Sequence, residues 1–444
     1  LYLGFNKQDS YVGKWVEIAP TRKETEKKSA TREWLDAVLF AGTAALIIRT
    51  FMIEAFMIPT TSMEGSLLAG DFLFVSKFHY GVRLPQAPIS FPFVHNTLPF
   101  TSSTKSYLDW VVLPYARIPG IKDVERNEIV VFNYPDDDRN PDVPALGEIH
   151  VTSMKQNYIK RCVAVAGDSM EIRDRVLYIN GAPAWKPPEM QHSYNVKLPN
   201  NNAQQLAMKL QKEFGFRYNR GTKRTGPDPN NNIRMTGYVN LIEAHMSESK
   251  VKELQEKLPS ITITPIIHNW AFYSPDRKDA AAGRANFKQK QMLNIQRAAI
   301  PINEYQMMPG DPKNATFPKH PSTDLWTIDN FGPIFIPKAG VTTPLNKQNI
   351  WLYEKIISVY EGHELKYGSD GSNITIDGKP ASEYTFEMDY YWMMGDNRHA
   401  SLDSRYWGYV PEDHIIGRPW FVLFSWEGGP RMDRFLRPIS GWEP

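Results

Sequence analysis

The feature that most constrains this chain is an unbroken run of apolar and small residues, Ala37–Ile48. This run alone is too short to cross a hydrocarbon layer, which takes about 20 residues of helix. It can be extended to residues 34–58 if Asp36 lies at the entrance and Arg49 reaches toward the headgroups. We therefore predict a transmembrane helix over residues 34–58, with Trp34 at the interface. The alternative is a buried helix of a soluble protein.

The charges on the two sides of this segment differ. Lysines and arginines precede it, whereas carboxylates follow, which predicts a basic cytoplasmic segment over residues 1–33 and an external location for everything after about residue 58. No small-residue cleavage motif follows the run, so a cleavable signal peptide is not expected. The chain begins with Leu1 rather than methionine, so we expect residues upstream of it. The charged residues concerned are Lys14, Arg22, Lys23, Lys27, Lys28 and Arg32 before the segment, and Glu54, Glu64 and Asp71 after it.

The composition is that of a globular protein, with 12% aromatic and 42% hydrophobic residues in 444. A net charge of +2 gives no field that would favour nucleic acid. Cys162 is the single cysteine, so an intramolecular disulfide is impossible. Cytosolic proteins and bacterial envelope proteins without disulfides both fit this cysteine content.

Beyond the membrane segment we predict a mainly β protein. Short runs rich in β-formers recur, and Asn180-Gly181 and Asp377-Gly378 are strong signals for tight turns. We expect an antiparallel β domain formed by residues 59–185 and 350–426, followed by a tail of residues 427–444. The predicted strands are residues 71–75, 128–132, 170–172, 176–179, 356–360, 374–376 and 420–424.

Residues 186–349 differ in character from the parts on either side. They contain stretches rich in Asn and Pro, such as Gly226–Asn232. Apolar residues at helical spacing predict two helices, near Ala203–Phe214 and Ser247–Leu258. We interpret this region as an α+β insertion between two halves of the β domain, and the sequence gives no clue to its role.

Two short clusters hold a candidate nucleophile and a candidate base. Ser62 lies in Pro59–Met63, directly after the membrane segment, and a serine hydroxyl needs a base to remove its proton. No histidine motif accompanies it, so Lys160 in Tyr158–Arg161 is the other possible base. A lysine must be neutral to accept a proton, and burial beside apolar groups lowers its ordinary pKa of about 10.4.

A third cluster near the end of the chain could support this pair. It consists of Gly395–Arg398 followed by Ser401, Asp403 and Arg405. Ser401 could hydrogen-bond and orient the lysine amine, while Asp403 and Arg405 could form an ion pair that fixes the loop. Each cluster alone also has an ordinary structural explanation: a helix exit, a solvated strand edge and a polar turn.

In this order, and after a membrane anchor, the three clusters resemble those of the bacterial type I signal peptidases, Ser–Lys proteases that remove signal peptides. The family has an Ile-Pro-x-x-Ser-Met loop and then Gly-Asp, a Tyr-Ile-Lys-Arg box and then Gly-Asp, and a Gly-Asp-Asn-Arg…Ser-x-Asp-Ser-Arg-x-Trp-Gly box. The resemblance covers roughly residues 34–185 and 350–426, and not residues 186–349. The matching residues are Ile58–Met63 with Gly70-Asp71, Tyr158–Arg161 with Gly167-Asp168, and Gly395–Arg398 with Ser401–Gly408.

The resemblance implies a role for each matching residue. Ser62 would be the nucleophile and Lys160 the general base. The Thr60 hydroxyl would share the oxyanion hole with the Ser62 backbone N–H. The remaining residues would orient the lysine (Ser401), support the site (Asp403, Arg405 and Asp396), or line shallow apolar pockets for the small residues before the cut (Phe56, Ile58 and Ile159).

The chain departs from the family's pattern in two places. After Ser62-Met63 the usual Pro-Thr-Leu is replaced by Glu64–Leu67, which we expect to alter the substrate cleft while the reacting atoms are retained. The second departure is the long insertion, which could be a lid, a docking surface for the secretion machinery or an embellishment of the fold.

The sequence therefore predicts a membrane-anchored serine endopeptidase that removes N-terminal signal peptides from translocated preproteins through an acyl-enzyme. It would act on the outer, periplasmic side of the bacterial cytoplasmic membrane. Its expected partners are preprotein signal peptides and the lipid bilayer, with the secretion machinery as a possible third, and no nucleic acid. No metal or cofactor is expected, because no Cys/His cluster has metal-ligand spacing.

Two rival functions remain. One is an inactive envelope scaffold that uses the β domain and the insertion for binding; the presence of both Ser62 and Lys160 speaks against it. The other is a self-cleaving Ser–Lys repressor-type protease, against which the membrane anchor and the lack of a DNA-binding module argue.

Overall fold

The computed structural model describes residues 10–12, 16–18, 29–92, 94, 98–101, 104–135, 151–199, 202–217, 232–236, 238–267, 316–318, 326–439 and 443. The chain divides into two compact units, residues 1–48 and 49–444. In the first unit, strands β1 (Ser10–Val12) and β2 (Val16–Ile18) pair antiparallel, and most of helix α2 (Ala30–Phe51) follows. Of the basic residues predicted to precede the membrane segment, only Arg32 lies within the described residues.

Helix α2 has the length and apolar composition needed to cross a membrane. It has 22 residues, and none of them is buried against the rest of the protein. The helix ends at Phe51 rather than at residue 58 as predicted, because residues 53–57 form strand β3 (Ile53–Met57). The Glu54 carboxylate in β3 forms ion pairs with Arg49 (2.9 Å) and Lys77 (2.8 Å), which satisfies a charge that hydrocarbon would not accommodate.

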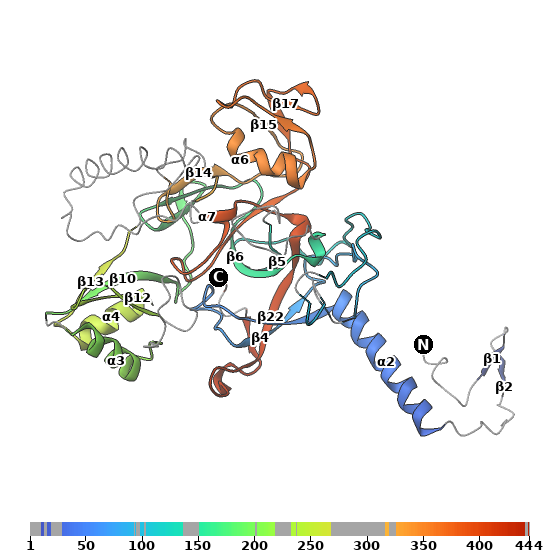
Figure 1. Ribbon diagram of the computed structural model, residues 1–444, viewed down its shortest axis with the longest axis horizontal. Coiled ribbons are helices and arrows are strands. Elements are labelled where there is room, and N and C mark those ends of the chain that lie inside the picture. Colours follow the sequence, from blue (N-terminus) through green and yellow to red (C-terminus); the bar gives the residue numbers. More distant parts are fainter. Residues whose placement is uncertain are drawn as a thin grey trace. The chain divides into compact units, whose positions relative to one another are not determined.

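The second unit is built around one large antiparallel sheet, which curls into a half-barrel. Figure 1 labels four of its strands, β4, β5, β6 and β22, around the middle of the molecule. The prediction of a mainly antiparallel β fold is confirmed. The strand order is β21 (Val410–Pro411), β20 (Tyr390–Met394), β6 (Asn157–Ala164), β5 (Ile129–Asn133), β22 (Ile415–Ser425), β4 (Asp71–Ser76) and β3, with β23 (Arg437–Pro438) also paired to β22.

The long strand β22 joins the two halves of this sheet. Its first residues pair with β5, and from Arg418 onward it pairs with β4. Gly417 lies at the change of partner, where a Cβ would come within 2.2 Å of the Ser76 carbonyl oxygen. A side chain at this position would therefore push the two halves apart, which explains why glycine stands at the bend.

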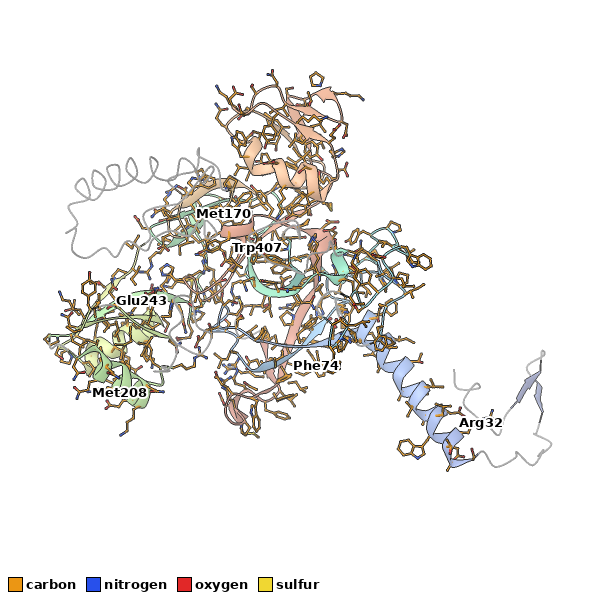
Figure 2. The ribbon with its side chains drawn as sticks, in the orientation of Figure 1. Arg32, Phe74, Met170, Met208, Glu243 and Trp407 are labelled. Atoms are coloured by element: carbon orange, nitrogen blue, oxygen red, sulfur yellow. The ribbon has the colours of Figure 1, made fainter. Side chains whose placement is uncertain are left out.

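Smaller sheets pack beside the large one. Two neighbouring core clusters contain Met170 and Trp407, respectively; both residues are labelled in Figure 2. The predicted strand 356–360 is wrong: these residues form a π-helix, Ile356–Tyr360, that continues α6 (Ile350–Lys355). Both Ile356 and Ile357 are buried in the first cluster, so tertiary packing overrides the strand propensity of this β-branched run. The first smaller sheet has the strand order β14 (Phe331–Phe335), β7 (Ser169–Arg173), β8 (Val176–Ile179) and β9 (Ala182–Pro183). The second consists of β15 (Thr342–Pro344) and β19 (Glu383–Thr385). The third has the order β16 (Leu365–Lys366), β17 (Thr375–Ile376) and β18 (Lys379–Pro380).

The insertion folds as an α+β layer with its own core. Its helices α3 (Ala203–Phe214) and α4 (Glu248–Lys257) match the two predicted helices, and Asn202 and Ser247 cap them. Residues 331–335, within the predicted insertion of residues 186–349, pair with β7, a strand of the predicted β domain. Its sheet has the order β11 (Ile233–Met235), β12 (Leu241–Ser247), β10 (Gln191–Lys197) and β13 (Thr262–Pro265).

The described residues of the segment predicted as a tail, residues 427–444, pack against the large sheet. Its strand β23 pairs with β22. Arg434 is buried and its Nε donates to the carboxylate of Asp71 (2.9 Å), the first residue of strand β4. Residues 434–438 therefore belong to the same structure as the segment that follows Ser62.

Candidate active site

Ser62 lies in a tight turn between strands β3 and β4. The turn is closed where the Ile58 N–H donates to the Asp71 carbonyl (2.8 Å) and the Gly70 N–H donates to the Ile58 carbonyl (2.8 Å). Inside it, the Glu64 N–H donates to the Thr61 carbonyl (3.0 Å). Ser62 is only 8% exposed. The turn thus holds the serine hydroxyl at one end of the sheet.

Lys160 comes from strand β6, in the other half of the sheet, and meets Ser62. Its Nζ donates to Ser62 Oγ (2.8 Å) and to the Ile159 carbonyl (2.9 Å). Lys160 is 3% exposed. Burial lowers the pKa of Lys160 to about 8, although the carboxylates of Asp403 and Asp396 act in the opposite direction.

This pKa decides what Lys160 can do. With a pKa of about 8, roughly a tenth of the amine is neutral at pH 7, whereas an ordinary lysine is neutral in less than about one molecule in a thousand. A neutral amine within hydrogen-bond reach of a serine hydroxyl can accept its proton. The arrangement therefore fits a base and its nucleophile.

The predicted oxyanion residue, Thr60, lies next to Ser62. Its Oγ1 is 3.3 Å from Ser62 Oγ. On the other side of the turn, Asn397 holds the backbone: its N–H donates to the Ser62 carbonyl (3.1 Å) and its Nδ2 to the Thr61 carbonyl (3.3 Å). The Ser62 backbone is therefore fixed by the loop that carries the third motif.

Asp403 and Arg405 form a buried bidentate ion pair in that loop. Arg405 Nε and Nη2 each lie 2.8 Å from an Asp403 carboxylate oxygen. The Gly395 N–H also donates to Asp403 (3.1 Å). Burial alone would raise the pKa of Asp403, but the Arg405 guanidinium holds it below its ordinary value. The predicted pairing of these two residues is present.

Ser401 is near the site but does not make the contact predicted for it. Its hydroxyl is buried and forms no hydrogen bond with Lys160, whose amine is held by the Ile159 carbonyl instead. A Cβ on Gly395 would lie 2.3 Å from Ser401 Oγ and 2.4 Å from the Ser62 carbonyl oxygen. Ser401 thus packs against the bare Cα of Gly395, beside the Ser62 backbone.

Asp396 pairs with Arg161, the residue that follows the lysine on β6. Arg161 Nε and Nη2 donate to the two Asp396 oxygens (2.8 and 2.6 Å), and Ser66 Oγ donates to one of them (2.6 Å). Both charged side chains are completely buried. Burial would raise the pKa of Asp396, but Arg161 holds it below its ordinary value. This pair ties the lysine strand, the third motif and the Ser62 turn together.

The three predicted pocket residues differ in exposure. Ile58 is 3% exposed and belongs to the core cluster of Met63, Leu67 and Leu73. Phe56 and Ile159 pack against this cluster and remain partly exposed. Phe56 and Ile159 therefore keep part of their surface open to solvent, whereas Ile58 is buried in the cluster against which they pack.

The amino-acid sequence is also similar to that of a known protein family. The profile of the family described as "Signal peptidase, peptidase S26" matches residues 31–220 and 351–424, more than half of the chain. The chain belongs to this family. Its mainly antiparallel β fold is consistent with that membership.

Two relatives named "Signal peptidase I" show how far the similarity extends. The chain is 30% identical to that of Rickettsia massiliae (strain Mtu5) over 158 residues, 36% of this chain and 46% of the relative. It is 33% identical to that of Pseudomonas aeruginosa (strain PAO1) over 137 residues, 31% of this chain and 33% of the relative. The chain thus spans less than half the length of these curated relatives.

The structure explains the departure from the family's pattern after Met63. The Glu64 carboxylate forms an ion pair with Arg217 of the insertion. Gly65 has a φ of +107°, and a Cβ there would lie 2.2 Å from the Glu189 carbonyl oxygen. Both unusual residues therefore face the insertion.

Several residues that the structure places at the site have no role predicted from the sequence. Arg161 and Asn397 lie inside the recognised motifs, so their motif membership was an available signal. Arg217 lies outside the three motifs, although the family profile extends to residue 220, and its pairing with Glu64 across 153 positions leaves no local pattern. Long-range polar contacts of this kind are visible only after folding.

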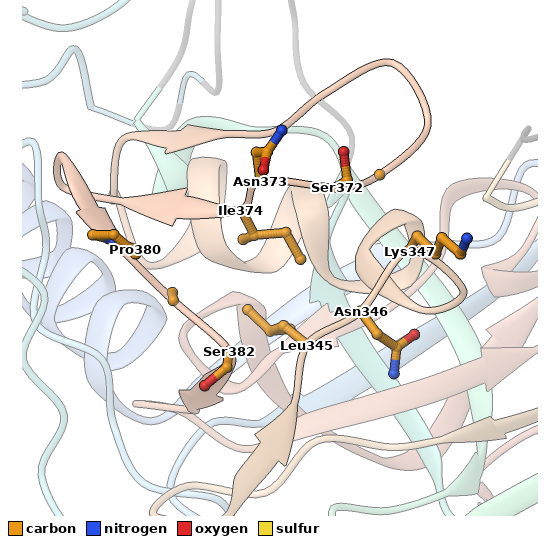
Figure 3. Close-up of a pocket in the computed structure, with 10 residues that line it drawn as sticks. Leu345, Asn346, Lys347, Ser372, Asn373, Ile374, Pro380 and Ser382 are labelled. Carbon is orange, nitrogen blue, oxygen red and sulfur yellow. The ribbon is translucent and has the colours of Figure 1, made fainter.

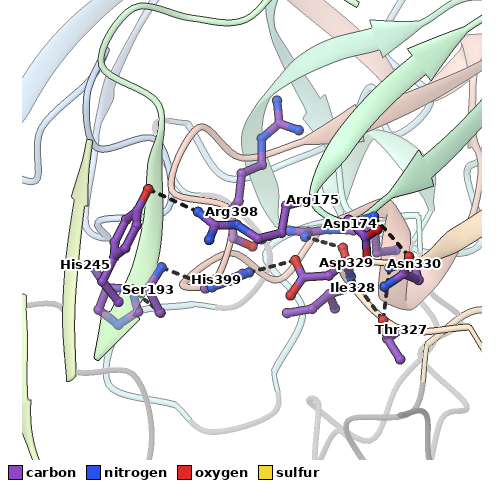
Figure 4. Close-up of polar contacts among 12 residues, drawn as sticks. Asp174, Arg175, Ser193, His245, Thr327, Ile328, Asp329, Asn330, Arg398 and His399 are labelled. Atoms are coloured by element: carbon purple, nitrogen blue, oxygen red, sulfur yellow. Dashed lines mark hydrogen bonds and ion pairs between the residues drawn. The ribbon is translucent and has the colours of Figure 1, made fainter. Parts of the chain in front are cut away.

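The insertion also joins the catalytic loop through polar contacts shown in Figure 4. The Ser193 N–H of strand β10 donates to His399 Nδ1 (3.0 Å), so this nitrogen is the acceptor. The proton is then on His399 Nε2, which donates to Asp329 (2.8 Å). These bonds connect β10, residues 395–399 and residues 326–330.

A separate cavity of about 470 Å³ opens near helix α6 (Figure 3). None of the residues that line it belongs to the Ser62 site. In the described part of the chain, no three His, Cys, Asp or Glu side chains come together as a metal site would require. The cavity is lined by Leu345, Asn346, Lys347, Gly371, Ser372, Asn373, Ile374, Pro380, Ala381 and Ser382.

Proposed function

We propose that this chain is a membrane-anchored serine endopeptidase that removes N-terminal signal peptides from preproteins with Ser62 and Lys160 as its catalytic dyad. The observation that carries the proposal is the 2.8 Å contact between Lys160 Nζ and Ser62 Oγ, with the amine buried. Membership of the signal peptidase family supports the substrate class. The relatives named Signal peptidase I point the same way.

In the first half-reaction, neutral Lys160 takes the proton of the Ser62 hydroxyl as Oγ attacks the scissile carbonyl carbon. The carbonyl oxygen becomes an oxyanion, for which the Ser62 N–H and the Thr60 hydroxyl are the proposed donors. When the intermediate collapses, the C–N bond breaks and protonated Lys160 gives its proton to the leaving amine. The products are an acyl-Ser62 ester and the new N-terminus of the mature protein.

In the second half-reaction, Lys160 is neutral again and takes a proton from water. The hydroxide attacks the ester carbonyl, the C–O bond to Ser62 breaks, and the proton returns to Ser62 Oγ. The signal peptide leaves with a free carboxylate. Every proton transfer uses the same amine, which is why its pKa must lie near the working pH.

The substrate is proposed to bind in an extended conformation beside strand β3. In the described part of the chain β3 pairs only with β4, so its other edge is open to a peptide strand. The partly exposed side chains of Phe56 and Ile159 would accept small residues before the cut. Ile58 would support this surface from below.

The anchor gives the proposal its location. Helix α2 ends at Phe51, so only a short segment of chain separates the apolar helix from Ser62. We propose the outer face of the bacterial cytoplasmic membrane as the site of action, with the lipid bilayer as a partner and the secretion machinery as a further candidate. The basic residues before the helix support this orientation.

The experiment is cleavage of a purified preprotein by the chain reconstituted in detergent micelles, with the product's new N-terminus sequenced. The wild-type chain should cut at one site after the signal peptide, and Ser62→Ala should not cut. Ser90→Ala is the control, because it removes the same hydroxyl from an exposed serine outside the site. A Ser62→Ala variant that cuts at the wild-type rate would refute the proposal.

A further inference from the structure

Glu64 is fixed in position relative to the nucleophile. It lies two residues after Ser62, and its N–H donates to the Thr61 carbonyl (3.0 Å). The next residues continue the turn, with the Leu67 N–H donating to the Met63 carbonyl (2.9 Å). Because these bonds tie the turn together, a displacement of Glu64 must also displace the Ser62 backbone.

Both oxygens of the Glu64 carboxylate are bound by residues of the insertion. Arg217 Nη2 donates to Oε2, and Asn232 Nδ2 donates to Oε1 (3.1 Å). The two insertion residues also hold each other: Asn232 Oδ1 accepts from the Arg217 backbone N–H (2.9 Å) and from its Nε (3.3 Å). Glu64 and Asn232 are both less than 10% exposed. The three side chains thus form a polar network, which Arg217 extends through an ion pair with Glu427 (3.8 Å).

The insertion reaches the nucleophile from a second direction. The Gln191 N–H donates to the Asp396 carbonyl (2.9 Å), and the Arg398 N–H donates to the Gln191 carbonyl (2.9 Å). Between these two residues lies Asn397, whose N–H holds the Ser62 carbonyl (3.1 Å). The start of strand β10 therefore supports the loop that supports Ser62.

We infer that the insertion is a working part of the active site, and that Arg217 is a positioning residue that fixes the Ser62 turn through Glu64. This inference rests on the proposed function. It accounts for both unusual residues after Met63: Glu64 binds the arginine, and Gly65 admits the backbone of Glu189. This inference also argues against one of the three roles considered for the insertion, that of a mobile lid, because a lid would not be bonded to the turn that carries the nucleophile.

Removing the arginine would leave a buried carboxylate without its charged partner, which the turn can relieve only by moving. A displacement of about 1 Å at a nucleophile costs on the order of a hundredfold in rate. Lys160 does not contact this network, so its titration should not change. The effect should therefore fall on kcat, with little change in KM or in the pH at which the rate rises.

The test measures kcat and KM for preprotein cleavage, over a range of pH, in the reconstituted chain and its variants. Arg217→Ala should lower kcat by about tenfold to a hundredfold, and Glu64→Gln, which keeps the shape of the side chain, should do the same. Arg217→Lys keeps the charge but loses the fork of donors, so it should recover part of the rate. Arg234→Ala is the control, because Arg234 pairs with Glu243 within the insertion (3.8 Å).

Each outcome decides the inference. It is supported if Arg217→Ala and Glu64→Gln lose kcat while KM and the pH profile stay as in Arg234→Ala. It is overturned if both variants fold and their kcat lies within about twofold of that control, or if the loss is in KM alone. If Arg217→Ala does not fold, Glu64→Gln and Arg217→Lys decide in the same way. A wild-type chain that cleaves nothing overturns the proposed function as well, whereas an active wild type with an inactive Lys160→Ala leaves that function standing.

Discussion

The catalytic sheet and the insertion bury different kinds of side chain. Around Ser62 the sheet buries charged groups completely, including Asp396, Arg161, Asp403 and Arg405. The core of the insertion consists of apolar and aromatic side chains, among them Leu210 with no exposure. Buried ion pairs contribute little net stability, so the charged groups around Ser62 serve the geometry of the site, whereas the apolar core of the insertion stabilises the part of the chain that carries Arg217.

The largest effect should come from Lys160→Ala. Without the buried amine the Ser62 hydroxyl has no base, and we expect cleavage to fall by at least about a thousandfold. The fold should remain, because an unpaired buried cation is removed. Single-turnover cleavage together with near-UV circular dichroism checks both statements. Lys155→Ala, at a residue just before β6, is the control, and a Lys160→Ala rate within about tenfold of it would contradict the dyad.

The next effect concerns the charged pairs of the sheet. Asp403→Ala leaves the buried Arg405 guanidinium without its carboxylate, and breaking a buried pair costs about 3–5 kcal/mol. Urea unfolding in detergent measures this loss. Asp109→Ala breaks the exposed pair with Lys105 (3.0 Å), which solvent screens, and should cost far less stability than Asp403→Ala. Equal losses of stability in Asp403→Ala and Asp109→Ala would contradict the claim that the buried ion pair near Ser62 differs from an exposed one.

The insertion should respond to the loss of packing instead. Leu210→Ala opens a cavity in its core, and such changes cost about 2–5 kcal/mol. Hydrogen exchange should show faster exchange in α3 and β10, while β5 and β6 keep their protection. Met208→Ala, on the exposed side of the same helix, is the matched control. Equal loss of protection in β5 and β6 would mean that the two regions unfold as one unit.

A smaller, pH-dependent effect should distinguish Lys160 from the buried ion pairs. Its pKa is lowered from 10.5 to about 8, so protonation is disfavoured in the folded state and the unfolded chain binds the proton more tightly. The lowered pKa therefore reduces the free energy of unfolding by roughly 3 kcal/mol below pH 8, and this reduction disappears as the pH rises from about 8 to 10.5. Lys160→Met should therefore be more stable than the wild type at pH 7 and lose that advantage above pH 10.5. An advantage that does not vary with pH would contradict the assigned pKa.

The sequence was informative where the decisive residues lie within short motifs. Ser62 and Lys160 each stand in a contiguous cluster, and the two helices of the insertion follow from apolar spacing that its core confirms. The strand predicted at residues 356–360 failed because buried β-branched residues also pack well in a helix. The hydrogen bond expected from Ser401 failed because a motif gives proximity but not the direction of a side chain.

The remaining part of the site could not be predicted from the sequence. The contact between Glu64 and Arg217 depends on how the insertion folds back onto the catalytic part, and nothing near either residue encodes it. Motif membership places Asn397 near the site, but the bond from its N–H to the Ser62 carbonyl depends on the path of the backbone. Contacts of this kind arise from the whole fold.

The most direct measurement is the titration of the Lys160 amine in the folded chain. Carbon-13 labelling at the lysine ε position would follow the amine by NMR, with Lys160→Ala identifying its signal and Ser62→Ala testing the effect of its partner. The proposed dyad predicts a midpoint at about 8. A midpoint at the ordinary value of about 10.4 would contradict the claim that Lys160 is the base for Ser62.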